Sequence, residues 1–159
     1  MRLVTFMQYF SLFLCVSGHG RLIEPPSRTS AWRFGFGTPA NYNDHETNCG
    51  GFERHWEKNE GRCGVCGDPW DQPVPRDGEH GGVYGVGVVV RTYQPGQTIR
   101  VVLDITANHL GFLQFKLCPS RPATQPCFDR NILRFPSGET RQELGPETGT
   151  HAFRVRQGC

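Results

Sequence analysis

The sequence lacks several features that would place the chain in other protein classes. It has no second long apolar run after its N-terminal segment, no block of like charges and no N-x-S/T glycosylation sequence. Apolar patterns with helical period are scarce, whereas glycine and proline are abundant, with 20 and 12 residues. These absences argue against several membrane spans and against a nucleic-acid-binding protein. An all-β, loop-rich domain is expected.

The N-terminal segment MRLVTFMQYFSLFLCVSG has the pattern of a secretory signal peptide. Arg2 gives a positive start, an apolar stretch follows, and Val16 and Gly18 are small enough for the −3 and −1 positions of a cleavage site. The stretch is shorter than the roughly 18–20 apolar residues that a membrane span needs. The protein is therefore expected to be secreted and extracellular. Cleavage after Gly18 would leave His19 as a free N-terminus, whereas cleavage one residue away would not.

The remaining chain has the size of one domain. Removing 18 of the 159 residues leaves 141, predicted as a single domain over 19–159. Arg2 leaves with the signal peptide, so 17 basic residues become 16 against 15 acidic ones, a net charge of +1. Lysines and arginines form no run that would attract an acidic substrate.

Short β-branched and alternating segments predict the strands. We expect strands at 83–93, 98–106, 112–117, 132–135 and 151–156, and a short helix within 52–60. The clearest is TIRVVLDIT, in which Ile99, Val101, Leu103 and Ile105 share one face. Several short antiparallel strands at this spacing predict a β-sandwich. Residues 19–48 are expected to be irregular.

Seven cysteines become six when Cys15 leaves with the signal peptide, and an even number in a secreted chain predicts disulfides. Cys118 and Cys127 flank a proline-rich loop and are expected to pair. Cys49 is expected to pair with Cys63 or Cys66, which leaves the other for Cys159. The alternative is a zinc site built on C63-G-V-C66, but the spacing does not match a zinc-ligand pattern.

Two of the histidines suit a metal site. After cleavage His19 would carry a free α-amine beside its imidazole, and the two nitrogens together can chelate one metal ion. His109 follows one predicted strand and precedes the next, so it could supply a third nitrogen. Three nitrogen donors in planar geometry favour Cu(II), and an α-amine with a pKa near 8 can bind metal at neutral pH.

Four motifs then follow one another as in the lytic polysaccharide monooxygenases: HGRLIEPPSR, PANYNDHETNCGGF, CGVCGDPWDQP and TANHLGFLQFKLCP. The chain most resembles the animal type, auxiliary activity family fifteen, over nearly all of 19–159. The resemblance implies an immunoglobulin-like or fibronectin-like β-sandwich with long loops and one copper ion in a histidine brace of His19 and His109. It also implies oxidative cleavage of chitin or cellulose with an external reductant and oxygen or hydrogen peroxide.

The chain departs from that family at its C-terminal end. The family places a tyrosine or phenylalanine near the copper axis in a later segment, and this sequence ends at Cys159 before it. The last strands of the sandwich are therefore expected to be missing, and no axial residue is assigned. Two other functions stay open: a non-catalytic chitin- or cellulose-binding module, and a disulfide-rich extracellular structural protein.

The stretch NYNDHE lies where the family builds part of its flat substrate-binding face. Tyr42 is the first candidate for contact with polysaccharide, and Asn43, Asp44 and His45 are further candidates. The three tryptophans are large enough to be core residues and are predicted so: Trp32, Trp56 and Trp70.

Overall fold

The computed structural model describes residues 19–157 and confirms a mostly β architecture. A four-stranded sheet has the order β1-β2-β6-β4, formed by β1 (His19–Glu24), β2 (Ile99–Ala107), β6 (Gly149–Gln157) and β4 (Leu133–Arg134). A second, two-stranded sheet pairs β3 (Phe112–Leu113) with β5 (Gln142–Glu143). Three short helices complete the fold: 3-10 helix η1 (Ala31–Phe34), π-helix η2 (Glu53–Lys58) and α1 (Gln125–Arg130).

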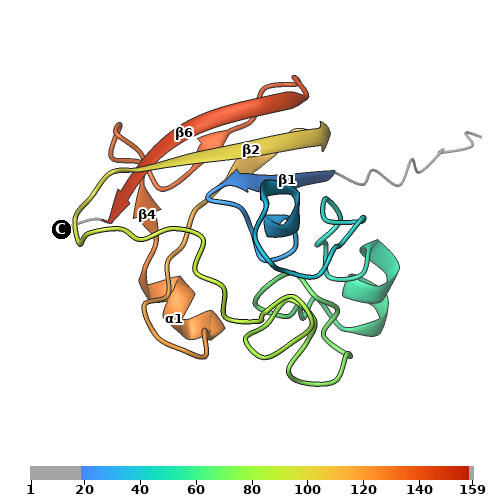
Figure 1. Cartoon of the computed structure of the whole chain (residues 1–159). Helices are drawn as coiled ribbons and strands as arrows, with labels where there is room; N and C mark the ends of the chain where they lie inside the picture. The colour runs from blue at the N-terminus through green and yellow to red at the C-terminus, as the bar shows by residue number, and fades with distance from the viewer. Residues whose placement is uncertain (1–18, 158–159) are drawn as a thin grey trace, which may run out of the picture.

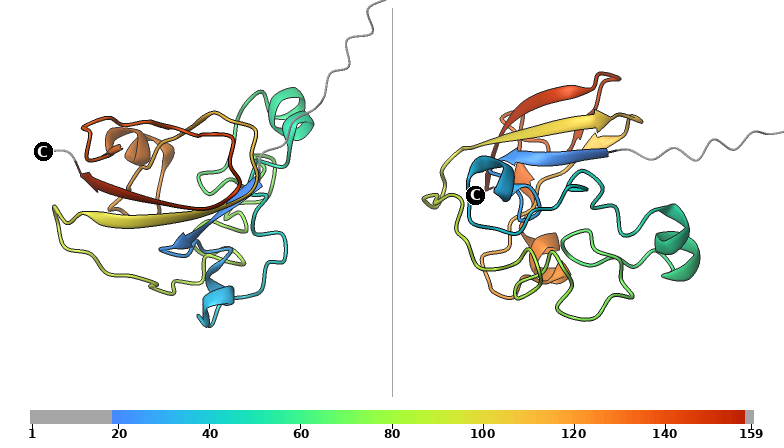
Figure 2. Two further views of the ribbon diagram at one scale, coloured as in Figure 1. Left: turned by 90° about the horizontal axis from the view of Figure 1, so that it is seen from above. Right: turned by 45° about the vertical axis from the view of Figure 1, so that its right-hand side comes forward.

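The four-stranded sheet forms one layer, and the loops and short helices of residues 31–98 lie below it in Figure 1. The views in Figure 2 keep the same two-layer arrangement. No helix among the residues that the structure describes is long and apolar enough to cross a membrane.

The core lies against one face of this sheet. The predicted strand β2 forms, and Val101 and Ile105 of the predicted apolar face are buried while Arg100 is exposed; Val102, on the other face, is buried as well. Val155 of β6 is completely buried. These side chains pack with residues from β4 and the loops around it, and the cluster contains Val101, Leu133, Phe135 and Val155, with Leu22, Ile99, Phe115 and Phe153 packed around it.

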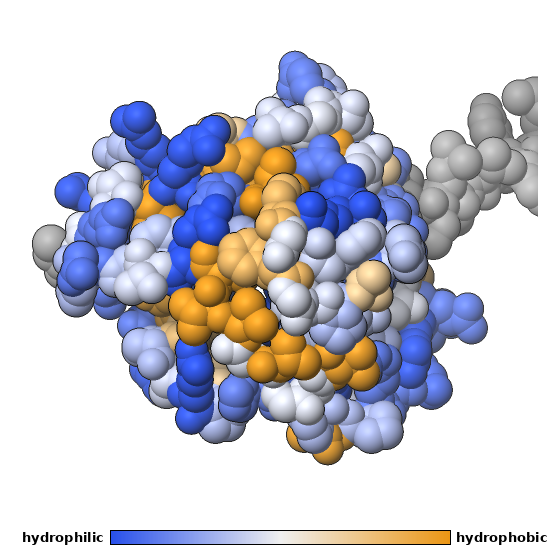
Figure 3. Space-filling model, viewed as in Figure 1, coloured by the Kyte–Doolittle hydropathy of each residue, from blue (hydrophilic) through white to orange (hydrophobic). Residues whose placement is uncertain are grey.

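The strand predicted at 83–93 is wrong. The segment is extended, but no main-chain hydrogen bond joins residues 86–93 to a neighbouring strand within the described part of the chain. Val86, Val88 and Val89 are exposed, and an apolar area crosses the face seen in Figure 3 where this segment runs in Figure 1. Its β-branched composition favours an extended backbone but supplies no partner strand.

Other boundaries also differ from the prediction. The strand expected at 112–117 is reduced to β3, with an isolated bridge from Lys116 to Ile132. The expected irregularity of 19–48 is wrong at its start, where β1 forms. Helix α1 was not predicted; it begins after Thr124, whose hydroxyl accepts a hydrogen bond from the Cys127 amide at 3.4 Å.

Candidate metal centre

The pairing of β1 with β2 brings the two predicted metal ligands to the same end of the sheet. His19 is the first residue of β1 and pairs in antiparallel register with Ala107, the last residue of β2. His109 lies two residues beyond Ala107 and is exposed. The register therefore places the two histidines, 90 positions apart in the sequence, at the same end of the β1–β2 pair.

A carboxylate holds one nitrogen of the His19 ring. The His19 Nε2 atom lies 2.7 Å from Oε1 of Glu46, and the amide of Asn43 donates a 2.7 Å hydrogen bond to Oε2 of the same carboxylate. The bond from Asn43 and the nearby charge of His19 lower the pKa of Glu46. Glu46 is thus an ionised acceptor that orients the imidazole and leaves Nδ1, next to the main chain, as the ring nitrogen available to a metal ion.

The loop that carries His109 is fixed by its neighbour Asn108. The Asn108 amide donates hydrogen bonds to the carbonyl oxygens of Gly145 and Glu147 at 2.7 and 2.6 Å. Its side-chain oxygen accepts a 2.8 Å hydrogen bond from the Leu110 amide. Leu110 adopts a positive φ of 66°, which turns the chain from β2 towards β3. The His109 backbone is therefore tied to the segment before β6.

The predicted polysaccharide contacts Tyr42, Asn43 and His45 lie in a turn beside His19. The Tyr42 side chain is 79% exposed and meets the Trp32 ring edge-on at 5.1 Å. The rings of His45 and His19 are 5.6 Å apart, and the main-chain amide of Gly20 donates to the His45 carbonyl at 3.0 Å. Tyr42 thus presents an aromatic side chain to solvent next to the paired ends of β1 and β2.

The prediction of Asp44 as a surface contact is wrong. Its side chain is completely buried, and its two oxygens accept hydrogen bonds from Arg21 at 2.9 Å and from Arg33 at 2.6 Å. The guanidinium of Arg21 also forms an ion pair with Asp104 of β2, at 2.7 Å. Burial alone would raise the pKa of Asp44, but the bonds from both arginines outweigh it and lower the pKa. Asp44 fastens the turn to the sheet.

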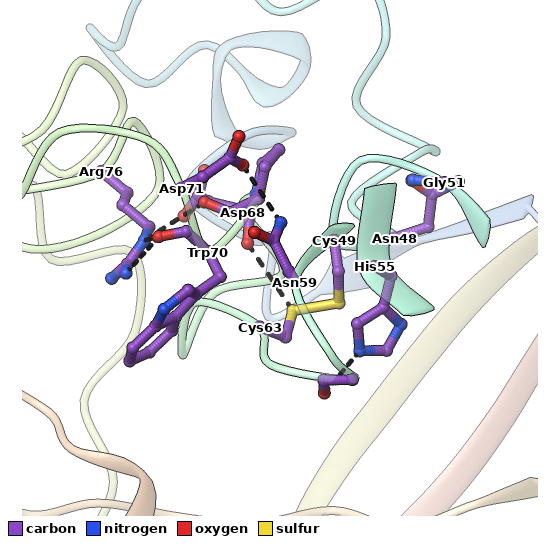
Figure 4. Close-up of a disulfide and its surroundings, with 12 residues drawn as sticks. Asn48, Cys49, Gly51, His55, Asn59, Cys63, Asp68, Trp70, Asp71 and Arg76 are labelled. Atoms are coloured by element: carbon purple, nitrogen blue, oxygen red, sulfur yellow. Dashed lines mark hydrogen bonds between the residues drawn. A yellow bond between two sulfur atoms is a disulfide. The ribbon is translucent and has the colours of Figure 1, made fainter. Parts of the chain in front are cut away.

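Two predicted disulfides are confirmed. Cys118 pairs with Cys127, and Cys49 pairs with Cys63, which excludes a zinc site built on Cys63 and Cys66. Figure 4 shows the Cys49–Cys63 bridge, which joins the turn before η2 to the loop after it, near the hydrogen bond that Asn59 donates to Asp71. Cys66 has no disulfide partner within residues 19–157, and its predicted partner Cys159 lies outside the described residues. The predicted signal peptide, with Cys15, also lies outside them.

The tryptophans are less buried than predicted. Trp56 is 57% exposed and Trp70 is 40% exposed, so the prediction of core residues is wrong for both. The guanidinium of Arg76 lies over one face of the Trp70 ring, 4.6 Å from the ring centroid. Figure 4 shows both residues beside the disulfide. Their size predicted burial, but both belong to a loop-rich segment outside the core.

Comparisons with known proteins agree with this arrangement. A family model described as lytic polysaccharide mono-oxygenase, cellulose-degrading, matches residues 19–156. The chain belongs to the lytic polysaccharide monooxygenase family. It is similar to the AA15 lytic polysaccharide monooxygenase from Thermobia domestica, solved in the Cu(I) state, with 44% identity and a TM-score of 0.83. The match covers 87% of this chain and 74% of that one. No curated protein sequence matches significantly.

Lytic polysaccharide monooxygenases are copper enzymes, and the donors at the edge of the sheet fit that metal. Within residues 19–157, no three His, Cys, Asp or Glu side chains are placed together to hold a metal ion. A metal site here therefore needs a donor of another kind, and an α-amine on His19 would be one. Imidazole suits Cu(II), and the carboxylate on Nε2 of His19 is the type of outer contact that metal-binding histidines have.

Glu46 is the residue of this site that sequence reasoning missed. Its position after Asp44 and His45 carries no signal of its own, because its partner His19 is 27 residues away. Only the pairing of β1 with β2 and the buried anchor at Asp44 show which carboxylate faces the His19 ring.

Proposed function

We propose that the mature protein begins at His19 and is a secreted copper monooxygenase that cleaves chitin, cellulose or both. The main support for the proposal is the register of β1 on β2, in which His19 lies opposite Ala107. His109 follows Ala107 by two residues. The family membership and the copper-bound relative support the same assignment.

The α-amine and imidazole of His19 and the imidazole of His109 would hold one copper ion as a histidine brace. When bound, copper supplies one-electron redox chemistry, through which oxygen or hydrogen peroxide, with an external reductant, hydroxylates a sugar C–H bond beside the glycosidic linkage. The chain's own part is positioning. Glu46 fixes the tilt of the His19 ring through Nε2, and Asn108 fixes the loop of His109.

Tyr42, Asn43 and His45 would form the part of the substrate face nearest this site. Tyr42 offers an exposed ring to the apolar face of a sugar. Asn43 is exposed but its amide is engaged by Glu46, so it contributes its remaining polar atoms. The open surface suits a flat crystalline polysaccharide better than a single chain held in a pocket.

The test is product analysis. The protein starting at His19 is loaded with copper and incubated with chitin or cellulose, ascorbate and hydrogen peroxide, and soluble products are examined by mass spectrometry. We expect oligosaccharides carrying one extra oxygen atom, and none from His109→Ala, which should remain folded because His109 is exposed. Polysaccharide binding without oxidised products would instead support the non-catalytic binding module.

A further inference from the structure

A strip of four arginines crosses three strands of the main sheet. Arg100 of β2 is the register partner of Arg154 of β6, and Arg156 of β6 is the partner of Arg134 of β4. Directly opposed residues of antiparallel strands point to the same face, as do positions i and i+2 of one strand. All four side chains therefore emerge on one face, opposite to the core face that contains Val155.

These arginines are not neutralised. All four are exposed, and within the described residues no carboxylate lies within 4.0 Å of any of their side-chain nitrogens. Like charges directly opposite on neighbouring strands are destabilising. Arg134 has one internal contact, a 2.8 Å hydrogen bond to the Gly138 carbonyl. A bound anion would relieve this repulsion.

The same arginines line two adjoining depressions. One, of about 560 Å³, lies between Arg100 and Arg154, and the other, of about 220 Å³, includes Arg134, Arg154 and Arg156. Arg154 and Pro136 line both, so the two depressions adjoin. The polar groups along them are neutral hydroxyl and amide side chains: Thr98, Ser137 and Gln142.

We propose that this arginine strip binds an anionic polysaccharide, a glycan chain bearing sulfate or carboxylate groups. Guanidinium groups pair with such anions through two parallel hydrogen bonds, and the hydroxyl and amide groups between them suit sugar hydroxyls. The opposed and alternate positions place the Cβ atoms of neighbouring arginines about 5–7 Å apart, so the charges are spread along a line, which suits a repeating linear polymer better than a single small anion.

A glycan fits better than a nucleic acid or a membrane. Single-stranded nucleic acids need exposed aromatic side chains on which bases can stack. The aromatic residues beside the strip, Phe135 and Phe153, belong to the core, and Phe135 is only 4% exposed. A membrane surface favours large apolar side chains that insert between headgroups, and the strip is flanked by Ala152 and Pro136.

The strip is remote from the proposed copper site. Arg100 stands near the start of β2, and seven residues of strand, about 23 Å, separate it from Ala107. In Figure 1 the strip lies at the left-hand end of the sheet and His19 at the right-hand end. It would therefore attach the protein to an anionic component of a composite matrix without occupying the site of the proposed oxidation.

The test compares binding of dextran sulfate and uncharged dextran, measured by calorimetry without copper. The variant Arg154→Gln/Arg156→Gln removes two charges of the strip. The matched control Arg121→Gln/Arg130→Gln removes two exposed arginines elsewhere that form no ion pair within the described residues. We expect dextran sulfate to bind the unchanged protein and the control alike, the strip variant about tenfold or more weakly, and dextran not to bind.

Equal binding of dextran sulfate by the strip variant and the unchanged protein would overturn the proposal. A DNA oligonucleotide of matched charge or phosphatidylserine vesicles, bound as tightly and with the same dependence on Arg154 and Arg156, would overturn the assignment to a glycan. Because no arm contains copper, failure here and failure of the proposed monooxygenase activity are distinguishable.

Discussion

The Nε2 atom of His19 lies 2.7 Å from the carboxylate of Glu46, on the turn that also carries Tyr42 and His45. This contact connects the first residue of the sheet with the loop proposed to face the substrate. Asp44 of the same turn is buried and paired with two arginines, and these ion pairs hold the turn that carries Glu46 in place. The positioning of the proposed metal ligand therefore depends on ion pairs that can be tested separately.

Replacing Glu46 should weaken copper binding without unfolding the protein. Outer partners of metal-binding histidines contribute about 10–100-fold in metal affinity, so Glu46→Ala should raise the dissociation constant for Cu(II) by that factor. Glu46→Gln keeps an acceptor oxygen and should recover part of the loss. Calorimetry measures both, with Glu57→Gln on exposed η2 as the control. Unchanged affinity in Glu46→Ala would show that the contact does not orient the ring.

Asp44→Asn should destabilise the fold strongly. The substitution removes the buried counter-charge that Arg21 and Arg33 share, although Arg21 keeps Asp104. Breaking a fully buried pair costs about 3–5 kcal/mol, which sets the upper limit of the loss. Urea unfolding measures the change. The surface pair of Asp129 with Lys116 provides a control, because Asp129→Asn should cost about 1 kcal/mol or less.

The same residue should make stability depend on acid pH. The pKa of Asp44 is lower in the folded protein than in the unfolded chain, whose ordinary value is about 4. Its contribution is therefore fully present above pH 4 and is lost as the pH falls through the lower folded value. Unfolding free energies measured between about pH 6 and pH 3 should decline less steeply for Asp44→Asn than for the unchanged protein; parallel curves would contradict this assignment.

Removing the Cys118–Cys127 disulfide should cost about 2.5 kcal/mol. The bridge closes a short loop, with a sequence separation of 9, and the loop-entropy relation gives that value. The double variant Cys118→Ser/Cys127→Ser should show the loss in thermal unfolding. The His109 loop is held by Asn108 and not by this bridge, so Cu(II) affinity at a temperature where both proteins are folded should stay the same. A large fall in affinity would mean that the bridge also shapes the metal site.

Tyr42→Ala should weaken polysaccharide binding and leave stability unchanged. The side chain is 79% exposed, so little core packing is lost. Stacking contacts of aromatic side chains contribute about 1 kcal/mol, which is about fivefold in affinity. Pull-down on chitin and cellulose, with thermal unfolding as the control, measures the effect. Equal binding by the variant would remove Tyr42 from the proposed substrate face.

How much could be predicted depended on whether a feature was local. Strand β2 could be predicted because Ile99, Val101, Leu103 and Ile105 recur at every second position of one continuous segment. The strand expected at 83–93 was wrong because its valines favour an extended backbone whether or not a partner strand is present. Strand β1 was missed because HGRLIE has little alternation, and its partner lies more than 80 residues away.

The candidate site shows the same limit. His19 and His109 could be proposed as a pair from their chemistry and from the family resemblance, but their common location depends on strand register. Asp44 was predicted as a polysaccharide contact because it lies in the stretch where the family builds part of its flat face. Its burial depends on Arg21 of β1 and Arg33 of η1, which the fold places against its two carboxylate oxygens. The arginine strip could not be seen either, since register alone aligns Arg100 with Arg154.

The central claim is that His19 and His109 form one copper site. The most direct measurement is a calorimetric titration with Cu(II) of the N-terminally sequenced protein that begins at His19, beside a control with one extra residue before His19. We expect tight one-to-one binding that the extra residue abolishes, because it removes the α-amine from the site. Equal, weak binding in both proteins would contradict it.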